Sequence, residues 1–159
     1  MPYGFTGSIL RVDLTADRVE VTRMDDSFYR TYMGGSALGT TFLLRECAPD
    51  LDPFDPGNLL IIAPGVTTGA AVSGVSRCSV TSLSPATGMV GDSQAGGSLG
   101  PAIKRAGFDA IVISGHAAAP SVLYVHDGGA EIQPGDHLTG KTTTEVLKML
   151  HAVHAEGKV

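Results

Sequence analysis

Apolar and polar residues alternate along several short stretches of the chain, and this period of two predicts β-strands. The alternation over residues 10–14 and 18–22, on either side of a short turn, predicts a β-hairpin with one solvated face. A second hairpin is predicted from residues 122–125 and 130–133, joined across Asp127, Gly128 and Gly129. Further strands are predicted at residues 59–63, which we expect at the centre of a sheet, at 77–82 and at 110–114.

Apolar residues spaced three and four apart predict a few short helices between these strands. Asp25 and Asp26 are suited to cap a helix that runs to Met33 and is stopped by Gly34. A second helix opens at the Gly34–Gly35 pair. Two more helices are predicted: one with Ser98 as its cap and Pro101 in its first turn, ending near Ala106–Gly107, and one over residues 143–155.

Strands outnumber helices in this prediction, and the two hairpins require antiparallel pairing. The predicted class is therefore α+β, with mixed, largely antiparallel sheets and a few short helices. Glycine-rich segments at residues 34–39 and 96–100 are similar, and each opens a predicted helix. This similarity predicts a pseudo-duplicated fold.

Composition is that of a folded globular protein. The 159 residues are 43% hydrophobic and 17% charged, the net charge is −5, and there is no basic block or tryptophan, which argues against nucleic acid as a partner. No signal peptide or membrane-spanning run is visible, and Cys47 and Cys78 have no metal or redox spacing. We expect a cytoplasmic protein in which both cysteines act as small hydrophobic residues.

Two motifs have an obvious functional reading and a simpler structural one. Residues 135–142 match the P-loop pattern, with Lys141 as its lysine, but a half-polar hairpin strand precedes them. We therefore favour a turn that caps a helix and keep nucleotide binding as an alternative.

His151 and His154 are spaced to share a metal on a helix, but no third ligand is near in sequence, so an exposed polar face is favoured.

The stretch from residue 61 to residue 100 is where we expect the chemistry. Arg77 is its only cation and Asp92 its only acid, among many glycines, serines and threonines. A guanidinium holds a phosphate with two parallel hydrogen bonds, and glycines before a helix start leave backbone N–H groups uncrowded. Two interpretations remain open on spacing alone: an anion site that includes Arg77 and Gly96, or a glycine-rich turn in which Arg77 pairs with a surface carboxylate.

A family resemblance extends over nearly the whole chain. Its motifs include Gly7–Thr15, Tyr32–Gly35, Asp52–Phe54, Asn58–Ala63, Ser84–Pro85, Gly96–Gly97, Ala106–Gly115 and His137–Lys141. In order and spacing they resemble the N-terminal domain of the aldehyde ferredoxin oxidoreductase family. In that family the Leu-x-Gly-Lys turn binds no nucleotide, so the resemblance argues against the P-loop interpretation.

The resemblance implies a tungsten or molybdenum enzyme in which two pterins hold the metal, magnesium bridges their phosphates and a [4Fe-4S] cluster lies nearby. Such enzymes oxidise aldehydes to carboxylic acids and pass electrons to ferredoxin, while some relatives reduce aromatic thioesters. By position, Arg77 and Gly96 match residues that contact the cofactor. Gln94 falls where an asparagine often supplies a main-chain oxygen to the magnesium. Ser36 stands where many relatives have arginine, which weakens the case for a cofactor contact there.

The cluster cysteines and substrate groups of the family have no counterpart in this sequence. We therefore expect residues 1–159 to be a single, truncated tungstopterin-binding domain, inactive alone, whose partners are ferredoxin and the remaining domains or subunit. The alternative is a free-standing interaction domain of the same fold that forms a homodimer.

Overall fold

A computed structural model describes residues 4–154, and a six-stranded sheet lies at its centre. The spatial order of the strands is β2 (Arg18–Arg23), β1 (Ser8–Asp13), β6 (Ala110–Ser114), β3 (Leu60–Pro64), β4 (Cys78–Leu83) and β5 (Val90–Ala95). Only β1 and β6 pair in parallel. A separate antiparallel hairpin consists of β7 (Ser121–His126) and β8 (Gly129–Pro134). The predicted mixed, largely antiparallel α+β class is confirmed, with β3 inside the sheet.

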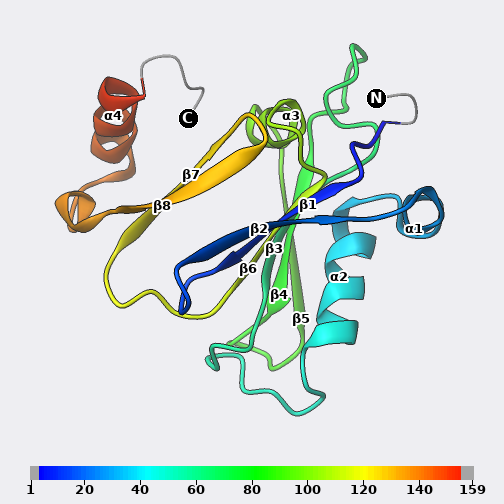
Figure 1. Cartoon of the computed structure of the whole chain (residues 1–159), viewed down its shortest axis with the longest axis horizontal. Coiled ribbons are helices and arrows are strands. Elements are labelled where there is room, and N and C mark those ends of the chain that lie inside the picture. The colour runs from blue at the N-terminus through cyan, green and yellow to red at the C-terminus, as the bar shows by residue number, and fades with distance from the viewer. Residues whose placement is uncertain (1–3, 155–159) are drawn as a thin grey trace.

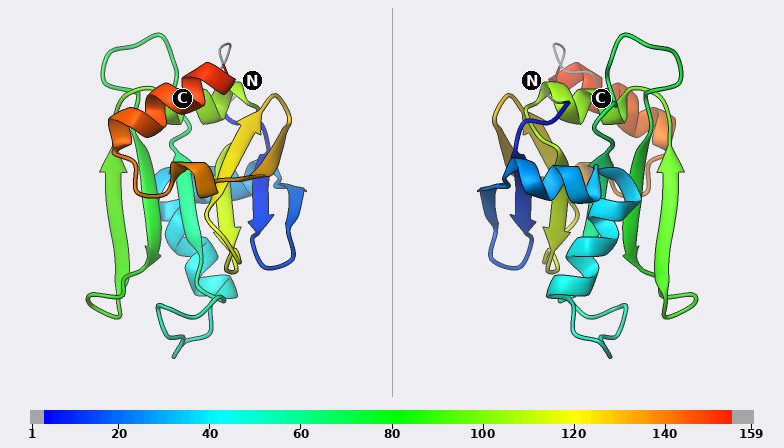
Figure 2. Two further views of the ribbon diagram at one scale, coloured as in Figure 1. Left: turned by 90° about the vertical axis from the view of Figure 1, so that its left-hand side faces the viewer. Right: turned by 90° about the vertical axis from the view of Figure 1, so that its right-hand side faces the viewer.

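The helices lie on both sides of this sheet (Figure 1). One side carries α1 (Asp26–Tyr32) and α2 (Gly35–Glu46), which are seen together in the right-hand view of Figure 2. The other side carries α3 (Leu99–Arg105) and the β7–β8 hairpin, followed by a 3₁₀ turn (Asp136–Leu138) and α4 (Thr143–Val153). No described helix is both long and apolar enough to cross a bilayer.

Alternate residues of β1 enter two separate hydrophobic clusters. Ile9 packs in the cluster with α1 and α2, whereas Leu10 and Val12 pack against Ile103 and Phe108 on the other side. All three β1 residues are at most 1% exposed. The predicted solvated face is present only in part on β1, because Arg11 and Asp13 are half-buried while Ile9 on the same face is buried in the cluster with α1 and α2. The solvated face is found on β2, whose residues are mostly exposed.

Asp25 caps α1 as predicted, whereas Ser98 precedes α3 without a side-chain capping hydrogen bond. The Asp25 carboxylate accepts a hydrogen bond from the Phe28 amide at 2.9 Å, and this hydrogen bond lowers the pKa of Asp25. Helix α1 ends one residue earlier than predicted, because Met33 already adopts the left-handed conformation (φ 51°). Gly34 then forms an isolated bridge with Gly65.

A buried ion pair ties the N-terminal segment to the end of α3. Lys104 and Asp109 are 4% and 2% exposed, and Lys104 Nζ lies 2.6 Å from Asp109 Oδ1. Lys104 also donates to the Gly4 carbonyl at 2.7 Å. Asp109 accepts from the Thr6 amide and hydroxyl and from the Gly7 amide, at 2.8–2.9 Å through Oδ2. Each charge is thus compensated by a partner inside the protein.

Strand β5 was not predicted from the sequence. It has a single large hydrophobic residue, Val90, and almost all of it is exposed at the edge of the sheet. Strand β4 begins at Cys78, one residue later than predicted, and α4 is described to Val153, so the predicted end at Ala155 lies outside the described residues. The two glycine-rich segments open α2 and α3 on opposite sides of the sheet, and the duplication stays a prediction.

Candidate functional site

The ends of β4 and β5 bring Arg77, Gln94 and Gly96 together. Cys78 pairs with Ala95 in the antiparallel register, so Arg77, directly before Cys78, and Gly96, directly after Ala95, lie at the same end of the sheet. Arg77 Nη1 lies 3.4 Å from Gln94 Oε1, a long and therefore weak hydrogen bond. All three residues are exposed. The expected convergence is present, while the cofactor roles of these residues stay predictions.

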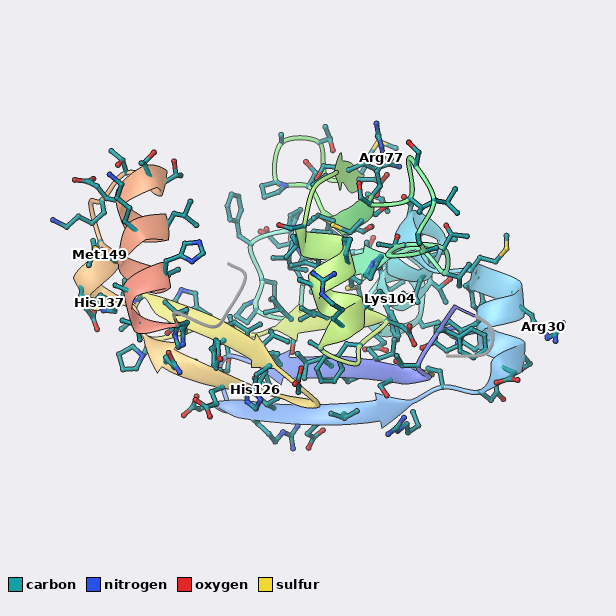
Figure 3. All side chains as sticks on the ribbon, turned by 90° about the horizontal axis from the view of Figure 1, so that it is seen from above. Arg30, Arg77, Lys104, His126, His137 and Met149 are labelled. Atoms are coloured by element: carbon teal, nitrogen blue, oxygen red, sulfur yellow. The ribbon has the colours of Figure 1, made fainter. Side chains whose placement is uncertain are left out.

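Arg77 is available to bind an anion. Figure 3 shows its side chain at the surface, apart from Lys104 on α3 and Arg30 on α1. Among residues 4–154, Arg77 takes part in no ion pair. The alternative in which Arg77 is occupied by a surface carboxylate is therefore not what the structure shows.

The glycines beside Arg77 differ in the space around them. A Cβ added to Gly97, which has φ +92°, would meet no atom within 4 Å, and one added to Gly96 would meet only Ser76 Oγ at 3.9 Å. Gly100 is crowded, because its added Cβ would lie 3.0 Å from Thr68 Cγ2 and 3.1 Å from the Ser76 carbonyl. Glycine at position 100 therefore allows α3 to pack closely. Gly96 and Gly97 are exposed, and their amides donate no hydrogen bond to another described residue.

A network of hydroxyls and one carboxylate holds β5 to the first turn of α2. Ser36 Oγ donates to Asp92 Oδ2 at 2.9 Å, so Ser79 Oγ, also 2.9 Å away, donates to Ser36. Thr81 Oγ1 donates to the other Asp92 oxygen at 3.3 Å. The carboxylate lies near the N-terminus of α2, where the helix dipole favours negative charge. Sequence reasoning missed this network, because its members lie in segments joined only by the fold.

Residues 135–142 form the predicted capping turn. Thr142 caps α4 in a capping box, in which Glu145 Oε2 accepts from the Thr142 amide and hydroxyl at 2.8 Å. The preceding strand, β8, belongs to a two-stranded antiparallel hairpin, whereas a P-loop follows a buried parallel strand. The Thr142 hydroxyl, which would face magnesium in a P-loop, is thus bound to the protein, and the geometry does not support nucleotide binding.

One residue of the histidine pair, His154, has a structural role. His154 stacks on Tyr124 with ring centroids 4.1 Å apart, which docks the end of α4 on β7. Within the part of the chain that the structure describes, no three His, Cys, Asp or Glu residues are placed to hold a metal ion. Cys78 is buried and Cys47 half-buried, both are free, and burial raises the pKa of both thiols, as expected for small hydrophobic residues.

Comparisons with known proteins identify the family of the chain. The profile of the aldehyde ferredoxin oxidoreductase N-terminal domain matches residues 9–159. The tungsten-containing aldehyde ferredoxin oxidoreductase of Pyrococcus abyssi is 38% identical over 148 residues, which are 93% of this chain and 24% of the relative. The WOR-like subunit of an aliphatic sulfonate oxidoreductase of Pyrococcus furiosus is 33% identical over 97% of this chain and 25% of its own length.

A solved structure shares the fold closely. It is the active-site complex BamBC of benzoyl coenzyme A reductase with 1,5-dienoyl-CoA, with a TM-score of 0.94 and 33% identity over 98% of this chain and 24% of that one. The chain thus has the fold of an oxidoreductase domain. It belongs to the aldehyde ferredoxin oxidoreductase family, and the part of the family that it matches is the N-terminal domain.

Proposed function

We propose that this chain is the cofactor-binding base of a tungstopterin or molybdopterin oxidoreductase that oxidises aldehydes to carboxylic acids, with ferredoxin as electron acceptor. The observation that carries the proposal is the juxtaposition of Arg77, which has no ion-pair partner among the described residues, with the open amides of Gly96 and Gly97. Two of the relatives, from Pyrococcus abyssi and Pyrococcus horikoshii, are named tungsten-containing aldehyde ferredoxin oxidoreductases.

The residues at this end of the sheet fit the phosphorylated end of a pterin. A guanidinium matches two phosphate oxygens, and uncrowded backbone N–H groups add donors without a side chain in the way. In the full enzyme the pterins would hold the metal, as the family resemblance implies. When bound, this centre would supply the two-electron oxidation of the aldehyde.

Gln94 is proposed to act through its main chain. A magnesium ion between pterin phosphates takes oxygen ligands, and a backbone carbonyl can serve whichever side chain the residue carries. The Gln94 side chain, 3.4 Å from Arg77, would at the same time limit the motion of the guanidinium. We expect the [4Fe-4S] cluster and the substrate groups in other parts of the enzyme, so the chain alone should not oxidise aldehydes.

Inorganic phosphate tests the anion site directly in the ¹⁵N-labelled chain. We expect saturable shifts of the Gly96 and Gly97 amide signals in a phosphate titration followed by NMR. Arg77→Ala should lower the affinity by roughly tenfold or more, since hydrogen bonds to charged groups are among the strongest. Arg77→Lys keeps the charge but loses the two parallel hydrogen bonds of the guanidinium, so its phosphate affinity should lie between those of the unsubstituted chain and of Arg77→Ala. Equal affinities of the three proteins would reject the site.

Exposed apolar residues on α4 favour one alternative function. Leu147 and Val153 are 43% and 71% exposed, and no α4 residue is buried. In a free-standing interaction domain this surface would be covered by a second copy of the chain. Light scattering combined with metal analysis separates the two functions, because the interaction domain would be a metal-free dimer that needs its α4 surface.

A further inference from the structure

Thr68 is a buried polar residue in the connection from β3 to β4. It is 8% exposed, and its hydroxyl donates to the Arg77 carbonyl at 2.7 Å. The same oxygen accepts a hydrogen bond from the Gly65 amide at 3.0 Å. One side chain therefore joins the end of β3 to the residue that directly precedes β4.

The methyl group of Thr68 makes a second contact, with α3. The crowding described for Gly100 is caused in part by this methyl group, 3.0 Å from the position of an added Cβ. Thr68 thus touches both sides of the site: the main chain of Arg77 and the helix that follows Gly96 and Gly97. A shift of Thr68 would change the distance between the guanidinium and the two open amides.

Arg77 depends on such an anchor because of where it lies. The β4 register begins only at Cys78, and the connection before it projects beyond the end of the sheet (Figure 2). The Thr68 hydrogen bond acts on the Arg77 carbonyl, which fixes the main-chain direction from which the exposed side chain extends. The bond is partly buried, because the Thr68 side chain that donates it lies inside the protein.

We propose that Thr68 is a positioning residue of the anion site, which holds Arg77 at the correct distance from Gly96 and Gly97. This rests on the proposed function, because it assigns Thr68 a role in that same site. Thr68 itself lies beneath the site and is not expected to touch the ligand.

Two substitutions separate the hydroxyl from the methyl group. Thr68→Val keeps the shape and removes both hydrogen bonds, and we expect it to weaken phosphate binding about tenfold in the NMR titration. Thr68→Ser keeps the hydroxyl and loses the methyl group, and its phosphate affinity should lie within about twofold of that of the unsubstituted chain. If packing of the methyl group were what mattered, Thr68→Ser would bind phosphate more weakly than this. If the valine variant does not fold, Thr68→Ala removes the same hydrogen bonds and carries the same expectation.

A double-mutant cycle with Arg77→Ala tests whether Thr68 acts through Arg77. Thr68→Val should add no further loss of phosphate affinity once Arg77 is gone, although it should still lower the melting temperature. Normal binding by the folded valine variant, or an equal loss in both backgrounds, overturns the positioning role while the site itself stands. If the unsubstituted chain binds no phosphate, both the proposed function and this inference are refuted.

Discussion

Removal of the Lys104 charge should destabilise the chain strongly. In Lys104→Met the Asp109 carboxyl group, 2% exposed, would lose its ionic partner in the interior and keep the Thr6 and Gly7 donors. The Gly4 carbonyl would lose its 2.7 Å hydrogen bond as well. Breaking a buried ion pair on one side typically costs about 3–5 kcal/mol, which is a large part of the roughly 5–15 kcal/mol by which a domain is stable.

Urea unfolding followed by circular dichroism measures this loss as a change in the free energy of unfolding. Arg105→Met is the matched control, because Arg105 is the next residue of the same helix and is exposed; it should change stability by no more than about 0.5 kcal/mol. Adding Asp109→Asn to Lys104→Met should cost less than the sum of the single losses, since the stranded charge is removed. The reasoning is refuted if Lys104→Met is no more destabilising than its control.

Four further predictions concern two glycines and the cap of α4. Gly100→Ala should cost about 1–3 kcal/mol, because its Cβ would lie 3.0 Å from Thr68, whereas Gly96→Ala should leave the melting temperature unchanged. In cofactor-loaded enzyme, Gly96→Ala should nevertheless lower the pterin content per protein; unchanged content would speak against a contact there. Thr142→Ala should destabilise α4 by about 1 kcal/mol, seen as faster amide exchange. The Thr142 hydrogen bonds lower the pKa of Glu145, so the stabilisation of α4 is complete above the ordinary value of 4.5 and is lost as the pH falls through the lowered pKa. Protection of the α4 amides, corrected for their intrinsic exchange rates, that stays constant across that window would contradict this.

Local patterns predicted the elements that local interactions determine. The β7–β8 hairpin has its turn residues and both alternating strands within a short segment, and the Asp25 cap lies directly before its helix. Strand β5 escaped prediction because an exposed edge strand needs no hydrophobic pattern: its pairing with β4 alone defines it. The pairing of β1 with β6 and the ion pair of Lys104 and Asp109 depend on the complete fold.

The same distinction, between what local sequence predicts and what depends on the complete fold, applies to the candidate site. Arg77 and Gly96 were predicted because a lone cation among small residues is visible in the sequence, and because the family resemblance includes them. The role of Thr68 was not predicted, since a threonine in a polar loop has no distinguishing pattern. Asp92 was noted as the only acid of the stretch, but its partners were not predicted. Only the fold shows that Thr68 reaches the Arg77 carbonyl and that Asp92 reaches the first turn of α2.

The parallel pairing of β1 with β6 also constrains how the chain can fold during its synthesis on the ribosome. Ile9 aligns with Ala110, so the first strand must wait for a partner synthesised 101 residues later. At typical elongation rates this wait lasts roughly 5–20 s. During that time the apolar residues of the first hairpin lack the strand that would cover them. We therefore expect the nascent N-terminal half to bind a chaperone that shields apolar segments.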